Sequence, residues 1–399
     1  MAEEALLTNL ERPSLERPSS LYIHVPFCRR KCLYCDFVSY PYGAAGELGY
    51  LAALEQEMAL WAGKAAEERW TLSTVFIGGG TPTCLSADGL GEIITKAGKY
   101  FNLSPDVEFT VEANPGTVER AGLAMLRQLG VNRLSLGAQA CDATTLRTLG
   151  RIHSHRQTVE AVEQARGAGF ANLNLDLICG VPGQTLEQWL SCLAQIISLQ
   201  PEHISAYGLQ LEPGVPLYAM IEAGILRPCD EELQADMYYG AIDALQAAGY
   251  RHYEISNFAR PGRECRHNLV YWHNGAYLGL GPAAHSRLGM ERLANEASLE
   301  DYQASLAAGR LPTAWSETLR IRDDMFETVF LGLRMMAGLD LAGFQARFGV
   351  ALDQVYPGVA ARLTENKLLT SQANFLRLTR RGLAVANMVM SEFATVTNS

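Results

Sequence analysis

The sequence predicts an α/β protein in which a partial (β/α)6 TIM-like barrel precedes a mostly helical, winged-helix-like C-terminal domain. Six short apolar, β-rich runs alternate with amphipathic helical stretches up to about residue 250, and this alternation favours a parallel sheet. From about residue 300 the pattern is mostly helical. The chain has 399 residues, of which 48% are hydrophobic, so it is long enough to bury more than one core.

The elements of the barrel follow from these runs in order. The expected strands are 21–25, 74–77, 107–111, 133–136, 172–178 and 203–207. The expected helices between them are 47–62, 87–100, 119–129, 156–168 and 185–199. Polar or Gly-rich loops follow the strands directly. In a β/α barrel the carboxyl ends of the strands carry the active site, so we expect these loops to meet at one mouth.

Four parts of the chain are expected. Residues 1–19, with the repeated "LERPS", form a flexible arm; residues 20–250 form the barrel. Residues 251–300 form a connecting region, and its part 251–286, rich in aromatic residues, His and Gly, is expected to be a functional loop region. Residues 301–395 form the C-terminal domain, and its stretch 365–387 predicts a helix end, a small hairpin and a helix.

Composition excludes several classes of protein. The net charge of −10 argues against general nucleic-acid binding. No run of about 18 apolar residues predicts a spanning helix. The acidic, polar N-terminus resembles neither a secretory signal nor a transit peptide, so a cytoplasmic protein is expected. In that compartment most of the nine cysteines should be reduced thiols or metal ligands. Six of them are expected to be ordinary small apolar residues, with Cys179 and Cys265 the two to watch: Cys84, Cys141, Cys179, Cys192, Cys229 and Cys265.

Three cysteines near the start, Cys28, Cys32 and Cys35, form a CxxxCxxC pattern. The loop is too tight for ordinary disulfides. A structural zinc site usually takes four protein ligands, and no second CxxC is present. A [4Fe–4S] cluster normally takes four thiolates, so three would leave one iron open to a small molecule. Zinc or chance clustering remains the alternative.

With Tyr34 before the last cysteine, this pattern resembles the radical S-adenosylmethionine (radical SAM) superfamily. The resemblance implies a [4Fe–4S] cluster whose open iron binds the methionine part of S-adenosylmethionine. One electron from the cluster would then cleave the sulfonium to a 5′-deoxyadenosyl radical.

Further stretches are similar to one group of that superfamily, which contains oxygen-independent coproporphyrinogen III dehydrogenase (HemN) and the haem chaperone HemW. They are "YIHVPFC", "GGGTPT", "VEANP", "RLSLGAQ", "LGRIH" and "NLDLICGVPGQT", in that order. Carboxylates suit ribose hydroxyls or an ammonium group, and an arginine suits a carboxylate. By resemblance, the S-adenosylmethionine pocket would be lined by Tyr22, Tyr34, Gly79, Gly80, Thr81, Glu112, Gln139, Arg151 and Asp176.

Two departures separate the members of this group. The dehydrogenases resemble CxxxCxxCxC, whereas Phe37 stands here at the place of the last cysteine. They also carry a longer N-terminal arm than the 27 residues that precede Cys28. Both departures favour the chaperones and put the dehydrogenase activity in doubt.

The stretch "RHNLVYW" is similar to the HNxxYW pattern of the chaperones, at His267, Asn268, Tyr271 and Trp272. The resemblance implies a haem site. Histidine is a frequent proximal ligand of haem iron, and aromatic rings pack on a porphyrin face. The ligand atom stays open, because the nearby residues His273, His285 and Cys265 could compete. A structural loop whose His and Asn bond to the backbone is the plainer interpretation of the residues alone.

The resemblance therefore implies a haem chaperone that holds a [4Fe–4S] cluster and S-adenosylmethionine. It would deliver haem to apo-haem proteins such as respiratory cytochromes, with peripheral membrane contact and a homodimer as further possibilities. The alternative within the group is oxidative decarboxylation of coproporphyrinogen III. A third hypothesis, a DNA-binding regulator, rests on five basic residues of the C-terminal segment: Arg362, Lys367, Arg377, Arg380 and Arg381.

Overall fold

The computed structural model describes residues 17–65 and 69–394, so most of the predicted N-terminal arm lies outside the described residues. Its main sheet has the strand order β11-β1-β4-β5-β6-β7-β8-β10-β9. The six strands from β1 to β8 in that order are parallel, which confirms the predicted partial barrel. They are β1 (Ser20–Val25), β4 (Thr71–Gly79), β5 (Asn102–Ala113), β6 (Arg133–Gln139), β7 (Leu173–Cys179) and β8 (His203–Gly208).

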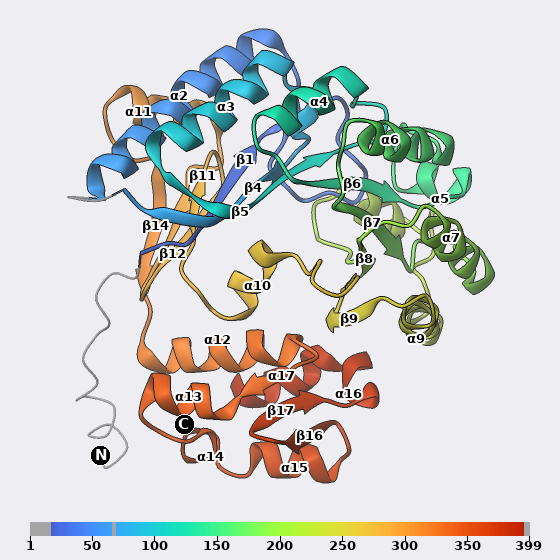
Figure 1. Ribbon diagram of the computed structural model, residues 1–399. Coiled ribbons are helices and arrows are strands. Elements are labelled where there is room, and N and C mark those ends of the chain that lie inside the picture. The colour runs from blue at the N-terminus through green and yellow to red at the C-terminus, as the bar shows by residue number, and fades with distance from the viewer. Residues whose placement is uncertain (1–16, 66–68, 395–399) are drawn as a thin grey trace.

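Helices cover the convex face of this sheet (Figure 1). The five predicted ones are α2 (Ala44–Lys64), α3 (Ala87–Tyr100), α4 (Arg120–Gln128), α6 (His155–Gly167) and α7 (Leu186–Ser198). Capping boxes begin α6 and α7, at Ser154 and Thr185. Further short elements complete this half: β2 (Phe27–Cys28), β3 (Tyr40–Pro41), η1 (Pro82–Cys84), α5 (Ala143–Thr148), α8 (Pro216–Glu222) and α9 (Glu231–Ala247).

The region expected to be a loop, 251–286, is built of short regular elements. They are β9 (Arg251–Glu254), β10 (Asn257–Ala259), α10 (Arg266–Trp272), β11 (Leu278–Leu280) and the start of β12 (His285–Leu288). β11 extends the parallel sheet beside β1, and β10 pairs antiparallel with β8. α10 lies on the concave side of the sheet, between the strands and the C-terminal domain (Figure 1). Strands of three or four residues show no usable period in a sequence.

A second hydrophobic core, from Met325 to Phe393, lies in the C-terminal part. Its elements are α12 (Ile321–Arg334), β15 (Leu339–Asp340), α13 (Leu341–Phe348), α14 (Leu352–Val355), α15 (Val359–Glu365), β16 (Leu369–Gln372), β17 (Phe375–Leu378), α16 (Arg380–Ala384) and α17 (Ala386–Ala394). Before α12 in the chain come β13 (Glu291–Asn295), α11 (Leu299–Ala307) and β14 (Thr313–Thr318), and α11 packs beside α2 in the first core. The predicted helix end, hairpin and helix at 365–387 correspond to α15, β16–β17 and α16.

Several ion pairs connect the C-terminal part to the rest of the chain, and two groups of them differ strongly in burial. Asp324 on α12 is buried and bonds to Arg287 of β12 at 2.6 Å and to Arg347 of α13 at 3.0 Å. Arg380 on α16 makes a bidentate, solvent-exposed pair with Asp243 on α9.

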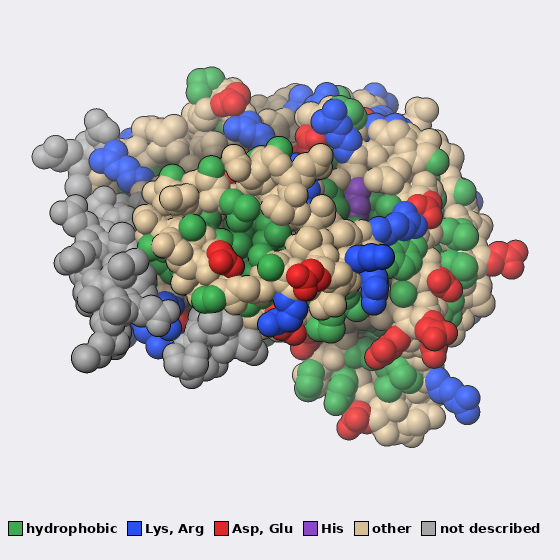
Figure 2. Space-filling view, turned by 90° about the horizontal axis from the view of Figure 1, so that it is seen from below, with side chains coloured by type: hydrophobic (Ala, Val, Ile, Leu, Met, Phe, Trp, Pro, Cys, Tyr) green, Lys and Arg blue, Asp and Glu red, His purple; other side chains and the backbone are tan. Residues whose placement is uncertain are grey.

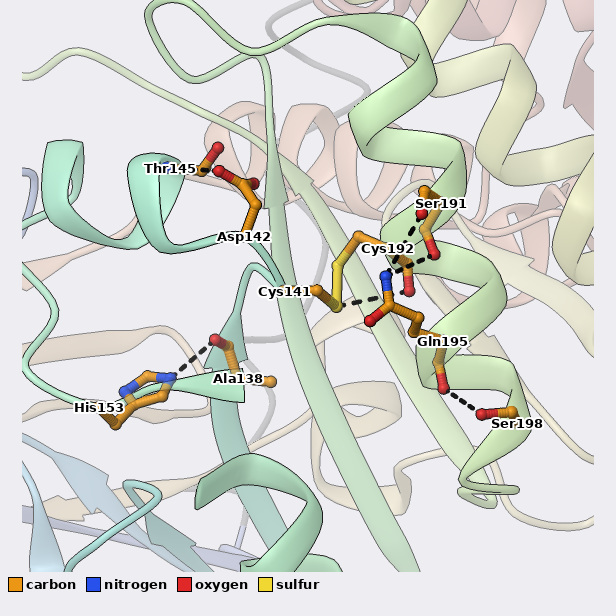
Figure 3. Close-up of a disulfide and its surroundings, with 9 residues drawn as sticks. All are labelled: Ala138, Cys141, Asp142, Thr145, His153, Ser191, Cys192, Gln195 and Ser198. Atoms are coloured by element: carbon orange, nitrogen blue, oxygen red, sulfur yellow. Dashed lines mark hydrogen bonds between the residues drawn. A yellow bond between two sulfur atoms is a disulfide. The ribbon is translucent and has the colours of Figure 1, made fainter. Parts of the chain in front are cut away.

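One expectation about the cysteines was wrong. Cys141 and Cys192, expected to be ordinary small apolar residues, are joined in a disulfide with their Cα atoms 5.2 Å apart. Figure 3 shows the bridge between the segment that follows β6 and the helix α7. The two residues are 51 positions apart, so nothing in their spacing indicated that the fold places them side by side. Among the described residues, no helix is long and apolar enough to cross a membrane.

Candidate functional site

The loop that carries the three cysteines is fastened to the "GGGTP" loop that follows β4. The N–H of Gly80 donates to the carbonyl of Val25 at 2.9 Å, and the N–H of Thr81 donates to that of Phe27 at 2.7 Å. A Cβ on Gly80 would lie 2.6 Å from the Phe27 carbonyl oxygen, and at Gly79 the backbone has φ +104°. These two positions therefore require glycine, because the two loops approach so closely.

A cavity of about 1090 Å³ opens at the carboxyl ends of the strands, where the sequence predicted the site. It is lined by most of the residues expected at the cluster and at S-adenosylmethionine: Cys28, Cys32, Tyr34, Cys35, Gly79, Gly80, Thr81, Glu112, Gln139, Arg151 and Asp176. Tyr22 does not line this cavity. Its side chain points into a neighbouring one, where its hydroxyl lies 3.1 Å from Nδ1 of His24.

The three cysteines fit an iron–sulfur cluster better than a single metal ion. They line one cavity, but among the described residues no three His, Cys, Asp or Glu side chains converge so that they could bind one ion. A zinc ion needs its ligands about 2.0–2.3 Å from one point. A [4Fe–4S] cluster takes each thiolate on a different iron, so its ligands must stand apart. The donor set therefore suits the cluster that the resemblance implies.

Arg151 lies beside the cysteines and is oriented by three partners. Its guanidinium donates to Sγ of Cys32 at 3.4 Å, to the Gly137 carbonyl at 2.7 Å and to Oδ1 of Asn114. The amide of Asn114 also donates to Oγ1 of Thr81 at 2.7 Å. Asn114 thus joins the arginine to the "GGGTP" loop. The sequence analysis did not single it out, although it stands within "EANP" at a predicted strand end.

Glu112 and Asp176 place two carboxyl groups in the same cavity. Burial, together with the charge of Asp176, raises the pKa of Glu112 to about 8, and Glu112 accepts the Gly79 N–H at 3.1 Å. Asp176 accepts from Ser135 at 3.0 Å and from Asn174 at 2.8 Å. At neutral pH one carboxyl is therefore protonated and able to donate, while the other is held by donors. Beside them, Gln139 has φ 63°, a left-handed conformation that non-glycine residues seldom adopt.

A second cavity, of about 660 Å³, lies under α10 and shares walls with the first. Asn268, Tyr271 and Trp272 line both cavities, so the "HNxxYW" stretch stands where the two meet. The ring of Trp272 is covered by the Arg334 guanidinium, 4.5 Å from the ring centre.

His267, the first residue of that stretch, lines only the second cavity and is bonded on both sides of its ring. It is 1% exposed, its Nδ1 lies 2.9 Å from both the Ser20 and Thr74 hydroxyl oxygens, and its Nε2 lies 2.8 Å from the hydroxyl of Tyr271. Both ring nitrogens are thus engaged. Burial, with the nearby Arg133 charge, lowers the pKa of His267 to about 3, so the imidazole is neutral.

Several cavity residues were not predicted from the sequence. Phe37 and Tyr207 are exposed in the first cavity, α9 contributes Gln234 and Tyr238, and Met388 reaches it from α17. The sequence drew attention to Phe37 only because it stands where the dehydrogenases have a further cysteine. The residues of α9 and α17 carry no local signal, because only the tertiary fold brings helices so distant in sequence to the barrel mouth.

Three of the five basic residues of the C-terminal segment are engaged within the chain. Arg380 pairs with Asp243, Arg362 pairs with Glu392 at 2.5 Å, and Arg377 donates to the carbonyl of Ala337 at 2.8 Å. Figure 2, seen from the side of the C-terminal domain, shows Lys and Arg side chains interspersed with acidic and apolar ones. Binding to a phosphate backbone favours a concentrated basic surface, so these contacts favour a packing role for this segment.

Comparison with known proteins gives consistent matches. The model of the Radical SAM superfamily matches residues 22–196, and that of the HemN C-terminal domain matches residues 321–385. The chain is 37% identical to the "Heme chaperone HemW" of Bacillus subtilis (strain 168), over 94% of this chain and 98% of that one. It is 33% identical to the protein of the same name from Escherichia coli (strain K12), with the same coverage of 94% and 98%.

Among solved structures, the coproporphyrinogen III oxidase HemN from Escherichia coli, described as a radical SAM enzyme, is similar with a TM-score of 0.84. The sequences are 25% identical, and the match covers 99% of this chain and 94% of that one.

Proposed function

This chain belongs to the radical SAM superfamily and, within it, to the family of HemW proteins, and on that premise we propose that it is a haem chaperone. It binds haem and delivers it to apo-haem proteins such as respiratory cytochromes. The relatives that match over nearly their whole length carry the name of a haem chaperone.

One observation carries the proposal: the aromatic "HNxxYW" residues form the shared wall of two cavities. Tyr271 and Trp272 line both the cavity of the cysteines and the cavity under α10. Aromatic faces suit a flat porphyrin, and the second cavity has the volume of a small-molecule pocket. Haem bound there lies next to the cysteine cavity.

In the first cavity the chain's own residues hold the cofactors. Cys28, Cys32 and Cys35 supply thiolates, and Arg151 suits the carboxylate of the methionyl group. Asp176 accepts hydrogen bonds, whereas Glu112, protonated below a pH of about 8, can also donate one to a ribose hydroxyl. When bound, the cluster supplies one electron for cleavage of the sulfonium. The second cavity shares walls with this one and lies beside it.

A matched pair of tryptophan variants tests haem binding. Titration of the anaerobically reconstituted protein with haemin should give a Soret band. The change Trp272→Ala should weaken binding by roughly tenfold, because a wall of both cavities is removed. Trp315→Ala changes a tryptophan that is 46% exposed on β14 and lines neither cavity, so it should leave binding unchanged. Equal weakening by both, or no Soret band in the unchanged protein, would refute the proposal.

The alternative function is oxidative decarboxylation of coproporphyrinogen III, which the likeness to the oxidase HemN favours. Against it, Phe37 occupies the place of a further cysteine and is exposed in the cavity. The assay supplies coproporphyrinogen III, a reductant and S-adenosylmethionine to the anaerobic protein. We expect no decarboxylated product; its appearance at more than one turnover would replace the chaperone function with the dehydrogenase.

A further inference from the structure

The histidine at the mouth of the second cavity, His285, stands in a different position from His267. His285 begins β12, is exposed, and lines the cavity under α10. Its ring nitrogens make no hydrogen bond to any described residue. A haem-iron ligand needs a nitrogen lone pair that is free to point at the metal. His285 meets this requirement without any change in the fold.

The other candidates in this region do not meet it. His267 also lines this cavity, but its Nδ1 is engaged by the Ser20 and Thr74 hydroxyls and its Nε2 by the Tyr271 hydroxyl, so ligation through either nitrogen would have to break a buried contact. Cys265 is 0% exposed, and burial raises the pKa of its thiol to about 12, so the thiolate is disfavoured. His273 is exposed but lines neither cavity.

Arginine side chains line part of the same cavity. Arg287 and Arg292 line it, and Nε of each is buried without a hydrogen-bond partner among the described residues. Arg287 and Arg347 share the carboxylate of Asp324, and Arg292 pairs with Glu327 at 2.7 Å. The three guanidiniums carry one more charge than the two carboxylates, so one further anionic group would balance the charge of this cluster. The propionate carboxylates of a porphyrin have the required charge and shape.

Part of the remaining wall is aromatic. Tyr22, Phe76, Tyr271 and Tyr277 line the cavity, and the rings of Tyr271 and Tyr277 meet edge to face with centres 4.6 Å apart. Haem has a flat apolar ring, an iron that binds imidazole and an acidic edge. This cavity of about 660 Å³ holds a complementary group for each of the three.

We infer that haem occupies the cavity under α10 with His285 as its iron ligand and with Arg292 and Arg287 facing its propionates. This inference rests on the proposed function. It assigns His267 to the positioning of α10 and not to the iron.

Three histidine variants test the inference by haemin titration, with Soret position and dissociation constant as readouts. His285→Ala should shift or abolish the Soret band and raise the dissociation constant by at least roughly tenfold. Free imidazole should restore the band, since it can fill the space left beside the iron. His273→Ala, the exposed control outside the cavity, should match the unchanged protein. His267→Gln should keep the Soret position even where its thermal stability falls.

The outcomes separate this inference from the proposed function. No haemin binding by the unchanged protein would overturn both. Binding that His285→Ala leaves unaltered in Soret position and affinity would overturn only the inference. A fourth variant, Arg292→Gln, should weaken binding without moving the Soret band, because it changes a propionate contact and not the iron ligand; a moved band would contradict that assignment.

Discussion

At the scale of single residues, the buried contacts of His267 explain why its role could not be inferred from the sequence. The "HNxxYW" stretch indicated residues of a cavity wall, but not that both ring nitrogens of its histidine are engaged by other side chains. Only the fold shows that Ser20 and Thr74, far away in the sequence, bond to the imidazole from β1 and β4. The same limit applies to Cys141 and Cys192, whose disulfide depends on tertiary placement.

The neutral, buried state of His267 predicts a pH dependence of stability. Its pKa is about 3 in the folded chain and near 6.5 when unfolded, so only the unfolded chain takes up a proton between these values. The contribution is fully present above pH 6.5 and is lost as pH falls towards 3, by about 1.4 kcal/mol per pH unit.

Denaturant unfolding of the native chain and of His267→Gln between pH 4 and 8 checks this. The stability difference between them should shrink as the solution becomes more acidic. His273→Gln, directly after the same helix and exposed, is the control. A difference that stays constant over this range would show that the imidazole is not held neutral.

At the scale of elements, periodicity predicted the long strands and helices and missed the short ones. The six parallel strands and five covering helices could be predicted because each repeats its apolar pattern at least twice. α10 and β11 could not, because seven and three residues carry too little pattern. α10 nevertheless forms a wall of the second cavity, which is why the sequence located its residues but not its shape.

Glu108 on β5 holds α10 in place. Its carboxylate accepts the N–H groups of Arg266 and His267, each at 3.0 Å, at the start of that helix. Glu108→Ala should therefore lower the free energy of unfolding by about 1–3 kcal/mol, since two buried N–H groups lose their acceptor.

The same change should weaken haemin binding while the Soret position stays fixed, because α10 is loosened and the iron ligand is untouched. Glu108→Gln keeps one acceptor oxygen, so its stability and its affinity for haemin should lie between those of the native chain and those of Glu108→Ala. Unchanged stability and unchanged affinity in Glu108→Ala would show that α10 is held by other contacts.

At the scale of the whole molecule, ion pairs of different burial hold the C-terminal domain in place, among them the buried group at Asp324 and the exposed pair of Asp243 with Arg380. Residues of both halves, such as Arg151 and Met388, line the first cavity. The relative placement of the two halves thus determines the shape of the site, and this placement has no signature in the sequence.

The two ion-pair groups predict very different costs. Asp324→Asn should destabilise the protein by about 3–5 kcal/mol, because it leaves the buried Arg287 and its neighbour Arg347 without their carboxylate. Asp243→Asn breaks an exposed pair with Arg380 and should cost about 0–1 kcal/mol. Thermal and denaturant unfolding measure both. Equal costs would mean that the buried group does not join the two halves.

The central claim is that this chain binds haem and transfers it to apo-haem proteins. The most direct measurement mixes the haem-loaded, anaerobically reconstituted protein with vesicles that hold a haem-free respiratory cytochrome and follows both absorption spectra. The account predicts that haem leaves the chain and appears in the cytochrome faster than it does from an equal amount of free haemin. Haem that stays on the chain, or that is transferred no faster than free haemin, would contradict the account.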